Sequence, residues 1–149
     1  RVTTAGRELI PHGEFRDVTG TPFDFRKAHR IGERIGDDED PDIRVQDGYD
    51  VNFVLNKAAG AYGKIAEAES ERSGLTMEVY TDKPGVQLYT SNGLPEGIYK
   101  EGAKYSTHQA FCLETQYFPN GMKNSHFIAP ILKVGDEYNF TTEYKFIVK

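Results

Sequence analysis

The segment Tyr138–Val148, which reads YNFTTEYKFIV, alternates large apolar side chains with polar ones more clearly than any other part of the chain. Successive side chains of a β-strand point to opposite faces, so this period of two predicts a strand. The segment 85–90, entered through a proline and left through Ser91-Asn92-Gly93, predicts a second strand. The segment 51–55 predicts a third, after the turn residues Asp47-Gly48.

The segment 62–71 is ambiguous, because its alanine and glutamate residues favour a helix. The turn residues Arg72-Ser73-Gly74 and the alternating apolar residues of 75–79 favour a β-hairpin, which is the interpretation that we adopt. One short helical turn is expected over 31–35. Strands so short and numerous predict an all-β fold, an antiparallel sandwich or barrel, and not alternating β–α units.

Length and composition narrow the class of protein. The 149 residues suit one domain, and no repeat or linker divides them. The formal charge of −5 argues against a nucleic-acid-binding protein, which needs a basic surface. No apolar run approaches the roughly 20 residues of a membrane span. The single cysteine, Cys112, excludes an internal disulfide framework and favours a cytoplasmic protein, with a processed secreted chain as the alternative.

A further strand pattern, 111–116, carries a carboxylate in its middle. Cys112, Glu114 and Gln116 are expected to share one face of this strand. A carboxylate that leaves water is costly unless it is paired or used in chemistry. Spacing alone favours Glu114 on a solvent-exposed strand face, with a catalytic role as the alternative. Next to Leu113, Cys112 is expected to be a small core residue and not a nucleophile.

For two other strand residues, the sequence also leaves open both a structural and a functional role. Asp50 stands where the loop after Gly48 meets the strand 51–55, as a turn former or a functional carboxylate. Gln87 is either the polar side of an alternating strand or a binding residue. Nearby aromatic residues are either core material or the lining of a sugar pocket: Tyr49, Tyr80, Tyr89, Tyr117 and Phe118.

Other patterns are set aside. The acidic run 37–42 has the alternate carboxylates of a calcium loop, but Ile43 stands where glycine is needed and Tyr49 where the bidentate glutamate belongs. We therefore expect a solvated loop there. The histidines have no metal-ligand spacing, and the chain has no Gly-rich phosphate loop, so no metal and no cofactor is expected. These histidines are His12, His29, His108 and His126.

Five motifs together resemble the aldose 1-epimerases, also called galactose mutarotases. They are LIPHGE at 9–14, PFDFRK at 22–27, GYDVNF at 48–53, PGVQLYT at 84–90 and FCLETQ at 111–116. They occur in the family's order and spacing, over essentially the whole chain but only about the C-terminal half of the family's domain. The resemblance implies a large antiparallel β-sandwich, the galactose mutarotase-like supersandwich. Residues 1–149 would be its C-terminal part, with no internal boundary.

The resemblance also implies roles for single residues. Glu114 matches the catalytic base, which takes the proton from the anomeric hydroxyl of a free aldohexose such as galactose or glucose. Asp50 matches the aspartate that holds sugar hydroxyls, and Gln87 matches a further glutamine that contacts substrate. Val51 departs from the family, which often has a non-catalytic histidine there. The family's acid is a histidine in an N-terminal motif that this chain does not contain, and none of the four histidines matches it.

Three classes of function stay open on the sequence. The first is a mutarotase whose N-terminal part, carrying the acid histidine, comes from another segment or chain; the abrupt start at Arg1 supports it. The second is a stand-alone carbohydrate-binding module that keeps Asp50 and Gln87. The third is a glycoside hydrolase with Asp50 and Glu114 as its carboxylate pair. We expect the first, because half a sandwich would leave sheet edges and an apolar face unpaired.

Overall fold

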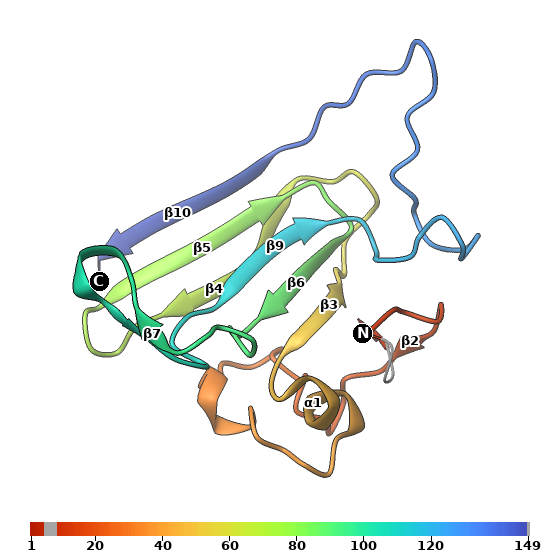
Figure 1. Cartoon of the computed structure of the whole chain (residues 1–149). Coiled ribbons are helices and arrows are strands. Elements are labelled where there is room, and N and C mark those ends of the chain that lie inside the picture. The colour runs from red at the N-terminus through yellow and green to blue at the C-terminus, as the bar shows by residue number, and fades with distance from the viewer. Residues whose placement is uncertain (5–8, 149) are drawn as a thin grey trace.

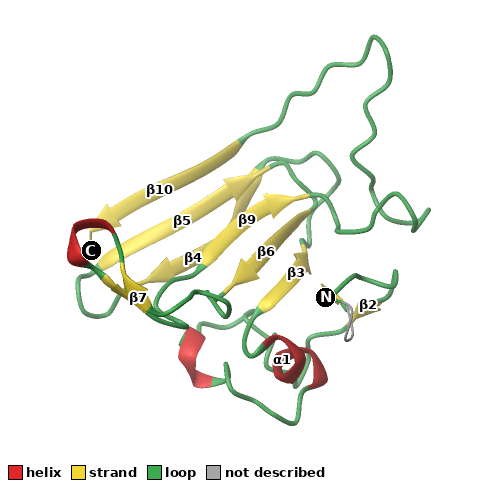
Figure 2. Ribbon diagram, viewed as in Figure 1, coloured by secondary structure: helices red, strands yellow, loops and turns green. Residues whose placement is uncertain are grey.

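The computed structural model describes residues 1–4 and 9–148, which form antiparallel sheets with little helix (Figure 2). Among these residues the sheets have the orders β2-β1-β3-β6-β9, β10-β5-β4 and β7-β8 (Figure 1). The five-stranded sheet contains β1 (Val2–Thr3), β2 (Phe15–Arg16), β3 (Asp50–Val54), β6 (Gly85–Tyr89) and β9 (Cys112–Gln116). The other strands are β4 (Gly63–Glu69), β5 (Leu75–Thr81), β7 (Gly97–Ile98), β8 (Lys104–Tyr105) and β10 (Thr142–Val148). The all-β prediction is confirmed.

The predicted hairpin is formed by β4 and β5, which pair antiparallel with one register shift between Lys64 and Ala66. Its turn is closed by hydrogen bonds from the Gly74 amide to the Ser70 carbonyl at 2.8 Å and from the Ser70 amide to the Leu75 carbonyl at 2.9 Å. The expected helical turn is a short 3-10 helix at Ile31–Glu33, and a second one spans Lys100–Gly102. Local turn chemistry therefore outweighed the helix propensity of the alanine and glutamate residues in β4.

The last strand begins later than predicted, because the residues before Thr142 bind the turn after β5 instead of a neighbouring strand. The Asp82 carboxylate accepts a hydrogen bond from the Thr141 amide at 3.0 Å. The Lys83 ammonium is buried, donates to the Tyr138 hydroxyl at 2.6 Å and lies 3.5 Å from the centre of the Phe140 ring. A desolvated cation–π contact of this kind contributes about 2 kcal/mol. It holds 138–141 outside the β10 ladder.

The central sheet has one apolar face, formed by Val51, Val86 and Leu88, which are each at most 5% exposed. Part of this face packs against the segment that precedes β3, which lies at one side of the sheet in Figure 1. The packing partners include Val18, Phe23, Ile43 and Tyr49. Burial of each such side chain contributes about 1.5–3 kcal/mol. Because this packing buries the apolar face, the opposite face of the sheet is the one that carries the polar side chains.

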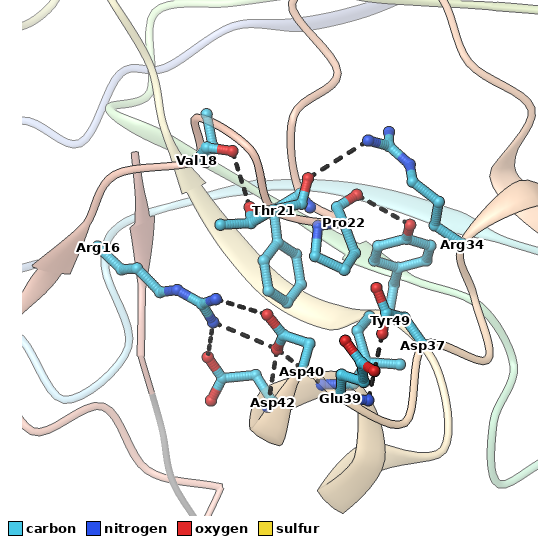
Figure 3. Close-up of polar contacts among 12 residues, drawn as sticks. Arg16, Val18, Thr21, Pro22, Arg34, Asp37, Glu39, Asp40, Asp42 and Tyr49 are labelled. Carbon is cyan, nitrogen blue, oxygen red and sulfur yellow. Dashed lines mark hydrogen bonds and ion pairs between the residues drawn. The ribbon is translucent and has the colours of Figure 1, made fainter.

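The acidic run is only in part the solvated loop that we predicted, because Asp38 and Glu39 are exposed but Asp40 and Asp42 are not. Asp40 caps the helix α1 (Pro41–Gln46) by accepting a hydrogen bond from the Asp42 amide, and both aspartates are buried. The Arg16 guanidinium of β2 donates to Asp40 at 2.5 Å and to Asp42 at 2.9 Å (Figure 3). The prediction was wrong for Asp40 and Asp42 because a cation 24 residues before Asp40 in sequence supplies the partner that burial requires. This fork ties α1 to the edge of the sheet.

Replacing Arg16 by Met is expected to lower the free energy of unfolding by about 3 kcal/mol, because it leaves two buried carboxylates without a cation. Urea denaturation of the native protein, followed by circular dichroism, measures the change. The control is Arg30→Met, which breaks the pair with Glu71 where both side chains are more than two-thirds exposed (77% and 71%). That change is expected to cost much less than Arg16→Met, because solvent screens an exposed ion pair. Equal costs would contradict a stabilising role for the buried fork.

Candidate functional site

The three predicted site residues lie on neighbouring strands and point to the same face. In the register of the sheet, Gln87 of β6 stands opposite Glu114 of β9 and opposite Asn52 of β3. Asp50 lies two residues before Asn52 and so projects to the same side. This polar face, defined by Asp50, Gln87 and Glu114, is the reverse of the apolar face. One sheet thus positions residues that are 64 positions apart in sequence, Asp50 and Glu114.

A chain of hydrogen bonds crosses this polar face. The Gln87 side-chain amide donates to the Asp50 carboxylate at 2.7 Å, and the Gln87 carbonyl oxygen accepts from the Gln116 amide at 3.0 Å. Gln116 follows Glu114 by two residues and shares its face. Sequence analysis placed Gln116 on this face but did not name it as a site residue. The signal available in the sequence was its spacing of two residues from Glu114 in the same strand pattern.

Glu114 is exposed to solvent on the polar face, as spacing alone favoured. Its strand, β9, is the last strand of the sheet, and the outer carbonyl of Leu113 accepts a hydrogen bond from the Tyr144 hydroxyl of β10 at 2.6 Å. Burial raises the pKa of Tyr144, and the nearby Glu114 carboxylate raises it further. The two larger sheets therefore meet beside Glu114, and its carboxylate is accessible to a ligand.

The structure corrects the expectation for Cys112 and places two of the aromatic residues whose role was left open. Cys112 is exposed and not a core residue, because it projects from β9 to the same face as Glu114. Of the five aromatic residues considered for a pocket lining, Tyr89 stands opposite Asp50 and Cys112 on the polar face. Tyr49 packs instead against Phe23 in the core. Long-range strand pairing therefore places Tyr49 and Tyr89 on opposite faces of the sheet.

Asn52 occupies a special position beside Gln87. It is 1% exposed, and neither polar atom of its side chain has a hydrogen-bond partner within the described part of the chain. A Cβ atom at Gly85 would lie 2.4 Å from its Oδ1 atom and 3.2 Å from the ring of Phe118. The glycine of the PGVQ motif is thus required for Asn52 and Phe118 to pack as they do.

None of the four histidines lies on β3, β6 or β9, the strands that carry the polar face, and His12 is exposed in the segment before β2. The His108 ring is within hydrogen-bonding distance of the Asp47 carbonyl (2.7 Å), the His126 ring contacts the Gly13 carbonyl (2.5 Å), and His29 pairs with Glu33. Within residues 1–4 and 9–148, no three His, Cys, Asp or Glu side chains gather in a way that could hold a metal ion. None of the helices described has the length and apolar character needed to cross a membrane.

The polar face is exposed at Glu114 and half-buried at Asp50 and Gln87, and Asn52 on the same face is buried. Two hollows of the described surface lie elsewhere, one beside Tyr138 and Phe140 and one beside His108 and Phe111. The geometry supplies an exposed carboxylate and a hydrogen-bonding platform, which together can bind and deprotonate a hydroxylated ligand.

Comparison with known proteins identifies the family. A family model described as aldose 1-epimerase matches residues 1–145. The chain is 42% identical to the galactose mutarotase of Bos taurus and 40% identical to that of Homo sapiens, over 94% of this chain and 39% of each relative. It is 32% identical to the aldose 1-epimerase of Escherichia coli, over 94% of this chain and 40% of that protein. The chain belongs to the aldose 1-epimerase family.

A solved structure agrees with this assignment. The chain superposes on an aldose epimerase homologue from C. elegans with a TM-score of 0.83 and 27% sequence identity, covering 99% of this chain and 43% of that one. The predicted family and its all-β sandwich fold are thus confirmed. The chain spans about two-fifths of the length of the curated relatives that it matches, somewhat less than the half that the motifs indicated.

The residue before Asp50 generates a prediction about alkaline pH. The Tyr49 hydroxyl is buried and donates to the Pro22 carbonyl at 3.0 Å (Figure 3), and burial raises the pKa of Tyr49 to about 12. Tyr49→Phe is expected to lower the free energy of unfolding by about 1 kcal/mol at neutral pH, where the hydroxyl is neutral in both states. Urea denaturation at several pH values measures it.

The difference between wild type and Tyr49→Phe has a defined pH dependence. The folded pKa lies above the ordinary value of 10.0, so the advantage of wild type is complete below pH 10. As the pH rises from 10 toward 12, the unfolded state ionises first, and the advantage declines. A stability difference that stays constant across this range would contradict burial of the neutral phenol.

Proposed function

We propose that this chain supplies the catalytic base and part of the sugar-binding surface of an aldose 1-epimerase that interconverts the α and β anomers of free aldohexoses such as galactose or glucose. The observation that carries the proposal is the alignment of Asp50, Gln87 and Glu114 on one polar face. The relatives named galactose mutarotase and aldose 1-epimerase support the choice of reaction.

The reaction needs two proton transfers on a pyranose ring. The C1 hydroxyl loses a proton and the ring oxygen gains one, which opens the hemiacetal; rotation about the C1–C2 bond and the reverse transfers close it as the other anomer. Each positioned proton transfer contributes about 10²–10⁴-fold to the rate. Glu114, exposed on the polar face, is the base for the C1 hydroxyl, and the Asp50 carboxylate and Gln87 amide hold other hydroxyls of the sugar. No cofactor takes part in this scheme.

The acid comes from a separate segment in this proposal. None of the histidines of this chain lies on β3, β6 or β9, and the chain spans only about 39% of its mammalian relatives. An N-terminal segment that carries the acid histidine would cover the exposed part of the polar face, at Glu114. That segment is the partner that we propose, as a second chain or as part of the same protein. The exposed thiol of Cys112 favours a reducing, cytoplasmic location.

Replacing Glu114 by Gln is expected to lower the rate of accelerated mutarotation by at least about 10²-fold while the protein stays folded, because the exposed amide keeps the shape of the side chain but cannot take a proton. Polarimetry of fresh α-galactose and α-glucose, with the native protein and everything that co-purifies with it, measures the rate. The matched control is Glu96→Gln in an exposed loop. Equal rates for wild type and Glu114→Gln would remove Glu114 from the mechanism.

The partner segment can be tested by mass. Native mass spectrometry of the purified protein is expected to show this chain together with a histidine-containing polypeptide of the family's N-terminal part, joined covalently or not. Denaturing conditions then distinguish the two cases. A monodisperse 16.8 kDa monomer that binds galactose without accelerating its mutarotation would favour the carbohydrate-binding module instead.

A further inference from the structure

The orientation of the Gln87 amide is dictated by its two neighbours. The Asp50 carboxylate can only accept hydrogen bonds in its ionised form, so the NH₂ group of Gln87 must face it, at 2.7 Å. The carbonyl oxygen of Gln87 then points the opposite way, toward β9. There it accepts a hydrogen bond from the Gln116 amide at 3.0 Å. Gln87 is thus held at both ends of its amide group.

Gln116 is built into the sheet in a way that suits this contact. It stands opposite Gly85, where Asn52 and Phe118 occupy the space that a side chain would take, and it lies two residues along β9 from Glu114, on the same face. Its side chain is partly buried, in contrast to the exposed Glu114 on the same strand. The strand that carries the proposed base therefore also carries a side chain directed at the substrate-binding glutamine.

We propose that Gln116 is a positioning residue, which fixes the Gln87 amide so that its second N–H and Asp50 together present a preset hydrogen-bonding pattern to the sugar. This inference rests on the proposed function. Gln116 acts on the sugar only through Gln87 and takes no part in proton transfer. Without it, Gln87 keeps its contact with Asp50 but its carbonyl end is free, so the amide samples more orientations and sugar binding loses part of its preorganisation.

The test is the variant Gln116→Met, which keeps the length of the side chain and removes the donor. In the native protein we expect KM for galactose to rise about three- to tenfold, the value of one neutral hydrogen bond, with kcat changed less than about twofold. In a Gln87→Met background, Gln116→Met is expected to have no further effect on KM, because its target is gone. An unchanged KM, or a full effect in the Gln87→Met background, would overturn the proposal.

Controls separate positioning from general damage. Gln109→Met makes the same chemical change in an exposed loop, where Gln109 accepts a hydrogen bond from the Ser106 amide, and is expected to leave KM unchanged. Circular dichroism verifies folding of every variant, and Gln116→Leu replaces Gln116→Met if the latter unfolds. A loss of kcat without a rise in KM would assign Gln116 to the chemical step and overturn the positioning role.

A second measurement separates this inference from the proposed function. The side-chain ¹⁵N–¹H resonances of Gln87 report its hydrogen bonds whether or not the protein accelerates mutarotation. They are expected to shift and broaden in Gln116→Met and to stay in place in Gln109→Met. If wild type fails to accelerate mutarotation, the proposed function fails. Unchanged Gln87 resonances in Gln116→Met would overturn the inference about Gln116, whatever the outcome of the mutarotation assay.

Discussion

The strict division of the central sheet into two faces is the constraint on which the rest of the structure depends. Val51, Val86 and Leu88 are buried on one face, and the residues between them form the other. Because the period of a strand is two, a slip of one residue would place Asp50 and Gln87 in the core and expose the valines. The apolar packing against the segment before β3 therefore holds the polar residues in register, although it touches none of them.

Much of this arrangement could be predicted from local sequence. The alternating segments and their turn residues gave the central strands and the β4–β5 hairpin, and the five motifs gave the family. The partners of Asp40 and Asp42 could not be predicted, because Arg16 is distant in sequence and its proximity follows from the fold. β10 starts late for a similar reason. Lys83, in the turn after β5, binds Tyr138, which is 55 residues away in sequence. Gln116 lay on the predicted face, but its contact with Gln87 depends on strand order.

The site is organised at the boundary between the two larger sheets. β9 ends the five-stranded sheet, and Tyr144 of β10 reaches across to its outer carbonyl instead of a further strand. The proposed base thus lies on a strand with a single ladder partner, stabilised on its other side by side chains. An edge of this kind is where another segment can add contacts without disturbing the sheet, which agrees with a catalytic centre shared between two parts of one fold.

Cys112 has a practical consequence for studying such a centre. It is the single cysteine of the chain, it is exposed, and it projects from β9 beside Glu114 on the polar face. A thiol-reactive fluorophore would therefore attach at one defined point on the polar face without any engineering of the sequence. In the proposed enzyme, its emission would report monosaccharide occupancy and docking of the proposed covering polypeptide as separate optical signals.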